Sequence, residues 1–265
     1  LHKIVITVSI ILIRSLGLLS INNYMHVKTE IDQQVSISVN EITDSISNHV
    51  AEVLASKSTL TAYAVSLMGN DFSDGSFLNS FGQQTIKEQF ELAGIGREDG
   101  TWIGNDPNWQ PPNFVPSKRG WYQQAKKENK LVFTLPYADA STGEILISIA
   151  APLNKNNQFH GAIFTDVSLK QLSTISNSVD LFGAGYAFIV SNNGSFVAHP
   201  NANLNGKPLE NLFKTAITIS EQPLEIEVDG KMSTVQFRLL PQYGWAIGVV
   251  LDNDVINQPI KSLRN

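Results

Sequence analysis

YMHVKTEIDQQVSISVNEITDSISNHVAEVLASKSTLTAYAVSLM, residues 24–68, is the stretch that decides the fold, and it contains neither proline nor glycine. Its apolar residues recur in steps of four and three, at Val27, Ile31, Val35, Val39, Ile42, Ile46, Val50 and Val53. Such steps place side chains on one stripe of an α-helix. At 1.5 Å per residue, ~40 residues would reach roughly 60 Å, so the sequence predicts a long rod. A bend that divides it into two helices is the alternative.

The residues before this stretch are mostly apolar. An apolar run from Ile4 to Ile21 is interrupted by a few small polar residues and by Arg14. About 20 apolar residues are enough to cross a bilayer, and a central arginine costs roughly 2.5–3.5 kcal/mol on insertion scales. Lys3 before the run indicates a cytoplasmic start. We interpret residues 1–23 as an uncleaved transmembrane anchor, with a signal peptide or a packed soluble helix as the alternatives.

Beyond Gly69 the sequence changes to short β-rich segments. Asp99-Gly100 and Asn193-Gly194 each separate two apolar runs, which predicts two β-hairpins. A further strand pair follows each hairpin: residues 144–149 with 161–164, and residues 233–237 with 245–250. The sequence therefore predicts an α+β fold in which the long helix precedes two tandem lobes, each with an antiparallel sheet.

These features give the predicted domain boundaries. In chain order they are an anchor (1–23), a long helix (24–68), a first lobe (69–170), a second lobe (171–258) and the start of a segment that leads to a second membrane span (259–265). Residues 169–178 are expected to form the helical connection between the lobes.

Composition excludes several classes of function. The net charge of -5, from 19 basic and 24 acidic residues, argues against a nucleic-acid partner, which would require clustered cations. The absence of cysteine excludes disulfides, thiolate metal sites and cysteine nucleophiles. The five histidines lack metal-ligand spacing, and no hydrolase or phosphate-binding motif occurs. We therefore expect no metal and no cofactor, and an enzyme is the weaker class.

One dense polar and aromatic cluster stands out in the first lobe. It consists of Arg119, Trp121, Tyr122, Tyr137, Asp139 and Asp166. A guanidinium matches a carboxylate, whereas two carboxylates and tyrosine hydroxyls suit an ammonium group. A cation at one end and two anions at the other, with aromatic rings between, indicate a socket for a zwitterion.

A purely structural interpretation is also open for each of these residues. Arg119 could pair with Asp139 or Asp166 on a surface loop, and Trp121 could be a core residue. Asp166 could cap a helix that begins near Ser168. A hydrolase that uses Asp139 and Asp166 as acid and base is a more remote reading, and it would need the carboxyls ~5–10 Å apart.

The spacing Arg-x-Trp-Tyr, then Tyr-x-Asp, then a single Asp resembles the double Cache family of bacterial sensor domains, in particular its amino-acid-binding group in chemoreceptors. The resemblance covers roughly Val27 to Asp254 and includes the turn at Thr142-Gly143-Glu144 and the His199-Pro200 turn, whose histidine is expected to be structural. Phe114 stands where the family often has a tyrosine.

The resemblance implies two tandem PAS-like lobes and a role for each residue of the cluster. Arg119 and Trp121 would hold the carboxylate of a free L-amino acid in the membrane-distal lobe, and Tyr122, Tyr137, Asp139 and Asp166 would hold its amino group. It also implies an inner-membrane protein with its sensor domain in the periplasm, and a homodimer formed through the apolar stripe of the N-terminal helix. The alternative is the same fold sensing an amine or small organic acid for a sensor kinase or diguanylate cyclase.

Overall fold

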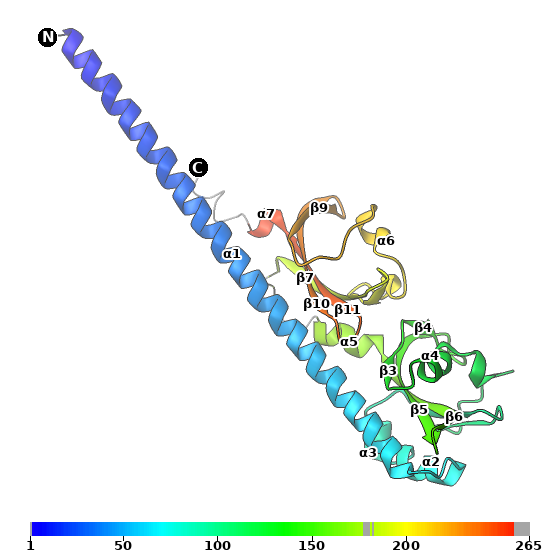
Figure 1. Cartoon of the computed structure of the whole chain (residues 1–265). Coiled ribbons are helices and arrows are strands. Elements are labelled where there is room, and N and C mark those ends of the chain that lie inside the picture. The colour runs from blue at the N-terminus through cyan, green and yellow to red at the C-terminus, as the bar shows by residue number, and fades with distance from the viewer. Residues whose placement is uncertain (1, 177–180, 182, 257–265) are drawn as a thin grey trace.

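The computed structural model describes residues 2–176, 181 and 183–256. Its first element is a single helix, α1 (His2–Met68), which passes without a break through the predicted anchor and the predicted rod. Figure 1 shows the N-terminal part of α1 standing clear of the remainder, while both sheets lie along its C-terminal part. The long helix is confirmed, and the alternative of two helices is wrong.

The apolar stripe of α1 packs against the chain's own lobes. Val39, Ile46, Val50 and Leu54 are all buried and share one core with the inner faces of both sheets. Val39, Ile46 and Val50, which belong to the stripe predicted as a homodimer interface, are therefore covered by the chain's own lobes. The homodimer itself stays a prediction.

The first lobe contains a six-stranded antiparallel sheet with the order β2-β1-β6-β5-β3, and β4 also pairs with β5. Its elements are α2 (Asp74–Phe81), α3 (Gln84–Lys87), β1 (Leu92–Arg97), β2 (Trp102–Gly104), η1 (Pro116–Lys118), α4 (Gly120–Glu128), β3 (Val132–Phe133), β4 (Tyr137–Ala138), β5 (Ile145–Lys155) and β6 (Gln158–Ser168). The predicted hairpin around Asp99-Gly100 is the β1–β2 pair.

The predicted pairing of β5 with β6 is confirmed, but its register differs from the expectation. Residues 161–164 lie opposite 150–153 rather than opposite 144–149. Both strands extend to a tight turn at Asn156 and Asn157, whose positive φ angles of 53° and 60° are those of a type I′ hairpin turn. The sequence analysis overlooked this turn, and the strands were consequently predicted too short.

The second lobe contains a five-stranded sheet with the order β8-β7-β11-β10-β9. Helix α5 (Leu169–Ser176) connects the lobes, and the other elements are β7 (Gly185–Ser191), β8 (Phe196–Ala198), η2 (Ala202–Leu204), α6 (Glu210–Phe213), β9 (Leu224–Val228), β10 (Lys231–Leu240), β11 (Trp245–Asp252) and α7 (Asn253–Ile256). The hairpin at Asn193-Gly194 and the β10–β11 pair are both confirmed. Residues 177–178 and 257–265 of the predicted boundaries lie outside the described residues.

The central strands of the first lobe have two chemically different faces. Ile147, Ile149 and Val167 belong to the core shared with α1, whereas Ala150 and Phe164 belong to a separate core under α4. Successive strand residues point to opposite faces of the sheet. Ser148 and Asp166, which are sequence neighbours of Ile147, Ile149 and Val167, therefore face α4. The sheet thus holds α1 on one side and a polar, aromatic compartment on the other.

One buried polar contact joins α1 to this sheet. The hydroxyls of Thr61 and Thr165 are both fully buried, and their oxygens lie 2.8 Å apart. We expect Thr61→Val, which keeps the side-chain shape, to lower the free energy of unfolding by about 1–2 kcal/mol, because the Thr165 hydroxyl keeps only its long bond to the Ile149 oxygen. Thr59→Val on the exposed side of the same helix is the control. Equal effects of the two substitutions in denaturant titrations would argue against the contact.

Candidate functional site

A cavity of about 440 Å³ opens in the first lobe between the start of α4 and the segment that joins β3 to β4. Its volume lies in the range of ~300–1,000 Å³ that is typical of small-molecule sites. The residues that line it are Lys118, Arg119, Gly120, Trp121, Gln124, Thr134, Leu135, Pro136, Tyr137 and Ala138. Three of the predicted site residues, Arg119, Trp121 and Tyr137, therefore meet at this cavity.

Arg119 is the residue that precedes α4, and its half-buried side chain extends over the β3–β4 segment. Its Nη2 donates a hydrogen bond to the backbone oxygen of Ala138 at 3.1 Å. Its Cζ lies 5.3 Å from the centre of the Tyr137 ring and 5.9 Å from that of Phe114. Among the described residues no carboxylate forms an ion pair with Arg119. The interpretation that Arg119 pairs with Asp139 or Asp166 is therefore wrong.

Asp166 lies on β6 and is almost completely buried on the face that α4 covers. Its Oδ1 accepts hydrogen bonds from the Ser148 hydroxyl at 2.5 Å and the Tyr137 hydroxyl at 3.2 Å. Burial raises the pKa of Asp166 to about 8, with repulsion from Asp139 adding to the rise and the bonds from Ser148 and Tyr137 and the charge of Arg119 opposing it. The carboxyl thus has two hydroxyl donors, and among the described residues no cation forms an ion pair with it.

The helix-capping interpretation of Asp166 is not supported by its position. The Ser168 hydroxyl, and not the Asp166 carboxylate, accepts a hydrogen bond from the backbone N–H of Lys170 at the start of α5.

Asp139 follows β4 and adopts a different electrostatic state. Its Oδ1 accepts bonds from the backbone N–H groups of Ser141 and Thr142, at 2.9 and 2.7 Å, and from the Thr142 hydroxyl. Burial alone would raise the pKa of Asp139, but these bonds and a contact with the Trp109 indole outweigh it and lower the pKa. Near neutral pH the site therefore combines one ionised carboxylate with one protonated carboxyl group.

Trp121 and Tyr122 follow each other on α4 but point in different directions. Trp121 is 1% exposed, packs 4.6 Å from the Phe164 ring and forms one wall of the cavity. The Tyr122 ring meets Phe159 edge-on. Burial raises the pKa of its hydroxyl, the charge of Lys126 opposes this rise, and the charges of Glu98 and Asp99 add to it. Tyr122 does not line the cavity, and neither do Asp139 and Asp166, so the cavity brings together only Arg119, Trp121 and Tyr137 of the predicted residues.

Trp109 belongs to the site but was missed in the sequence. Its Nε1 lies 3.4 Å from Oδ2 of Asp139, and its ring packs edge-on against Trp102 and Phe114. A tryptophan that is isolated in the polar loop 105–113 is unusual for a surface segment, and this composition was the available signal. Phe114 contacts Trp109 and Arg119 and thus covers the guanidinium from one side.

The arrangement can bind a small zwitterion but offers little for metal chemistry. Arg119, Trp121 and Tyr137 line the cavity, and the Tyr137 hydroxyl connects it to the buried carboxyl of Asp166 behind its lining. Among the described residues no group of histidine and acidic side chains is placed to hold a metal ion.

Comparison with known proteins gives a family and several relatives. The Cache domain family dCache_1 matches residues 25–260. The methyl-accepting chemotaxis protein PctB of Pseudomonas aeruginosa is 25% identical over 99% of this chain and 42% of its own length. PscA of Pseudomonas syringae is 30% identical over 66% of this chain and 28% of its own length. The chain thus spans less than half of the curated relatives that it matches.

Solved structures resemble the chain over nearly their whole length. The ligand-binding domain of Mlp24 with asparagine is 37% identical, with a TM-score of 0.75, and the match covers 89% of this chain and 98% of that domain. The ligand-binding domain of the Pseudomonas fluorescens chemoreceptor CtaA with L-serine is 28% identical, with a TM-score of 0.77, over 84% of this chain and 99% of that domain. These matches confirm the predicted fold.

The raised pKa of Asp166 has a testable consequence for stability. The folded chain keeps a proton on this group up to about pH 8, whereas an ordinary aspartate releases it near 3.8. The bound proton therefore contributes fully to the free energy of unfolding below pH 3.8. This contribution declines as the pH rises above 3.8 and is lost as the pH rises through 8. Between pH 6 and 8 we expect the free energy of unfolding to fall by roughly 2 kcal/mol more in the unmodified chain than in Asp166→Asn. Parallel pH profiles of the two proteins would contradict this assignment.

Proposed function

The chain belongs to the dCache_1 family of Cache domains, and from this membership we propose that it is the extracytoplasmic ligand-binding part of a bacterial methyl-accepting chemotaxis protein and that it binds free L-amino acids in its first lobe. The observation that carries the proposal is the cavity beside Arg119: among the described residues the guanidinium has no carboxylate partner, and Tyr137, which lines the same cavity, donates a hydrogen bond to the buried Asp166. The Mlp24 and CtaA domains, which hold asparagine and L-serine, give it further support.

The proposed roles follow from the chemistry of each group. Arg119 binds the ligand carboxylate, Trp121 forms the adjoining wall, and Tyr137, Asp139 and Asp166 bind the ammonium group. Each charge-assisted hydrogen bond contributes about 1.5–3 kcal/mol. Three or four of them approach the ~8 kcal/mol of a micromolar complex once the cost of ordering is subtracted.

Two further residues take indirect roles in this proposal. Phe114 screens the Arg119 guanidinium from water. Tyr122, whose ring meets Trp121 at 5.7 Å, supports the wall of the cavity and does not contact the ligand. This differs from the role that the family motif implies for Tyr122.

The neighbouring alternatives fit the same groups less well. A simple amine would leave Arg119 without a function, and a simple organic acid would meet the ionised Asp139 as a like charge. A zwitterion supplies a partner both for the guanidinium and for the carboxyls.

We further propose that α1 anchors the protein in the inner membrane with both lobes in the periplasm. Among the described residues one segment is long and apolar enough to span a membrane; it lies at the start of α1, and the chain leaves it uncovered. The first lobe lies at the end of α1 that is remote from this segment (Figure 1), which makes it the membrane-distal lobe. A homodimer contact on α1 would then use the face of the helix that the lobes leave exposed, which continues beyond Val39 with Glu41, Asp44, Asn48 and Glu52.

The role of Arg119 can be tested by calorimetric titration of the chain, held in lipid nanodiscs, with the common L-amino acids. We expect Arg119→Ala to weaken binding by about 10- to 100-fold, because a charge-assisted bond is lost, while the melting temperature without ligand stays unchanged. Lys127→Ala, an exposed cation on the same helix, is the matched control and should bind normally. Methyl esters and N-acetyl derivatives should bind poorly. Equal affinity for an amino acid and its ester would refute the carboxylate contact.

The state of Asp166 gives a second, independent test. With a pKa of about 8, this carboxyl is mostly protonated at pH 7 and must ionise to pair with an ammonium group. Binding should therefore release a proton, and affinity should rise with pH by up to about tenfold per unit between pH 6 and 8. Titrations at pH 7 in buffers of different ionisation enthalpy measure the release directly. Binding without proton release in the unmodified chain would show that Asp166 is not the ammonium partner.

A further inference from the structure

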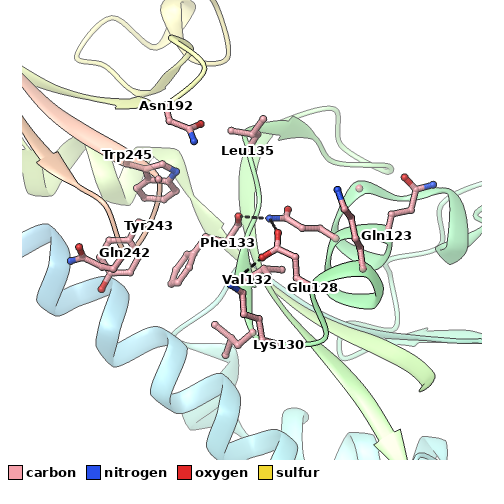
Figure 2. A pocket seen from close by; sticks show the side chains of 15 residues that line it. Gln123, Glu128, Lys130, Val132, Phe133, Leu135, Asn192, Gln242, Tyr243 and Trp245 are labelled. Carbon is pink, nitrogen blue, oxygen red and sulfur yellow. Dashed lines mark hydrogen bonds and ion pairs between the residues drawn. The ribbon is translucent and has the colours of Figure 1, made fainter. Parts of the chain in front are cut away.

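The two lobes face each other across a cavity of about 740 Å³. Figure 2 shows side chains of α4 and β3 on one side of it and residues 242–245 on the other, with the Phe133 and Tyr243 rings adjacent. The Phe133 ring lies 5.0 Å from Tyr243 and 6.0 Å from Trp245, with edge-to-face geometry in both pairs. Phe133 is thus a contact between lobes that are otherwise separated by open space at this position.

Phe133 is also tied to the proposed ligand socket through its neighbour Thr134. The backbone N–H of Thr134 donates to the Ser148 oxygen at 2.9 Å, and the Ser148 N–H donates to Oγ1 of Thr134 at 2.8 Å. The Ser148 hydroxyl in turn donates to Asp166 and lies 2.6 Å from the Tyr137 hydroxyl. A change in the hydrogen bonding of Asp166 therefore reaches residues 133–134 through one serine.

The helix that follows Arg119 reaches the same residue. Nε2 of Gln124, on α4, donates to the backbone oxygen of Phe133 at 3.4 Å, and Gln124 also lines the ligand cavity. The two elements that would hold the opposite ends of a zwitterion, α4 and β6, are consequently both connected to Phe133.

On the other side, Tyr243 is bonded to α1. Its hydroxyl donates to the backbone oxygen of Ala51 at 2.9 Å. Ala51 lies in the part of α1 that packs against the lobes, far along the helix from the proposed anchor. The contacts therefore form an unbroken series from Asp166 to the helix that would cross the membrane.

We propose that Phe133 and Tyr243 couple the ligand socket to α1. When the socket closes on a ligand, the β3–β4 segment shifts, the Phe133 ring presses differently on Tyr243, and the Tyr243–Ala51 bond transfers the change to the helix. The inference rests on the proposed ligand-binding function. The cavity beside Phe133 supplies the space in which the ring can move, because a closely packed interface would resist such a shift.

Amide hydrogen exchange of the chain in lipid nanodiscs tests the coupling. With L-asparagine or L-serine as the probe, exchange in residues 242–245 and 48–55 should change at least threefold in the unmodified chain. In Phe133→Leu and in Tyr243→Phe the probe should bind with its affinity altered less than threefold, while the change at both distant segments disappears. Tyr243→Phe keeps the ring and removes only the bond to Ala51, so it retains the fold where a larger change would not.

The controls are substitutions of the same kind elsewhere. Phe72→Leu alters a half-buried ring of the first lobe that contacts His160, and Tyr63→Phe alters an exposed tyrosine of α1. Both should respond to the probe as the unmodified chain does. If the exchange change at residues 48–55 persists in Phe133→Leu and Tyr243→Phe, the proposal is overturned, and the Thr61–Thr165 contact becomes the better route.

A ligand-free arm separates this proposal from the proposed function. Ser148→Ala removes the hydroxyl between Asp166 and Tyr137, and it should alter exchange at residues 242–245 in the unmodified background but not in Phe133→Leu. If neither probe binds, the proposed ligand class loses its support, and this comparison still decides the coupling. The same response to Ser148→Ala in both backgrounds would refute it.

Discussion

The alternation of side chains along β5 and β6 is the constraint on which the remaining structure depends. Ile147 and Ile149 bind the sheet to α1, while Ser148 between them faces the opposite compartment. Across the ladder, Thr165 bonds to α1 and Asp166 next to it bonds to Ser148. One residue step thus separates the structural face from the polar face, and a shift of register by one residue would exchange them. The polar site is therefore fixed in position by the same packing that fixes the helix.

Burying a carboxyl on the polar face is costly, and the local structure limits that cost in two ways. Asp166 receives two hydroxyl donors and takes up a proton, so that no bare charge remains under α4. Asp139 keeps its charge because backbone N–H groups of the following turn surround it. The two carboxyls differ because burial outweighs the hydroxyl donors at Asp166, whereas the backbone amides and other donors outweigh the lesser burial of Asp139. A cation that entered between them would lower the pKa of Asp166 and favour its ionised form. Asp166 is therefore the carboxyl of the pair whose charge changes when a cation binds.

The sequence was sufficient for the architecture and for part of the site. Periodicity identified α1, and the Asp-Gly and Asn-Gly turns identified the hairpins, because both signals depend on local geometry. The sequence was insufficient where the role of a surface depends on what packs against it. The periodicity of α1 predicts an apolar stripe, but it does not specify that the chain's own sheets cover that stripe. The orientation of Tyr122 could have been predicted from the sequence. Adjacent helix residues point about 100° apart, so Trp121 and Tyr122 could not both face the cavity. Trp109 stands out as a tryptophan in a polar loop, but the sequence could not specify its contact with Asp139, from which it is separated by 30 residues.

The second lobe has a sheet of similar design, but aromatic side chains pack on the corresponding face. The corresponding face of its sheet is filled by the rings of Phe188, Phe196, Phe213 and Phe237. His199 is buried among them, and its Nδ1 accepts the N–H of Asn201, which fits the structural role expected for it. In both lobes a glycine of the sheet, Gly94 or Gly248, allows a phenylalanine ring to lie flat against the backbone. In the first lobe the same face of the sheet also carries Asp166 and Ser148. In the second lobe it carries further aromatic rings. The difference between a polar socket and a closed core is therefore made by the side chains on one face of the sheet, within a common backbone plan.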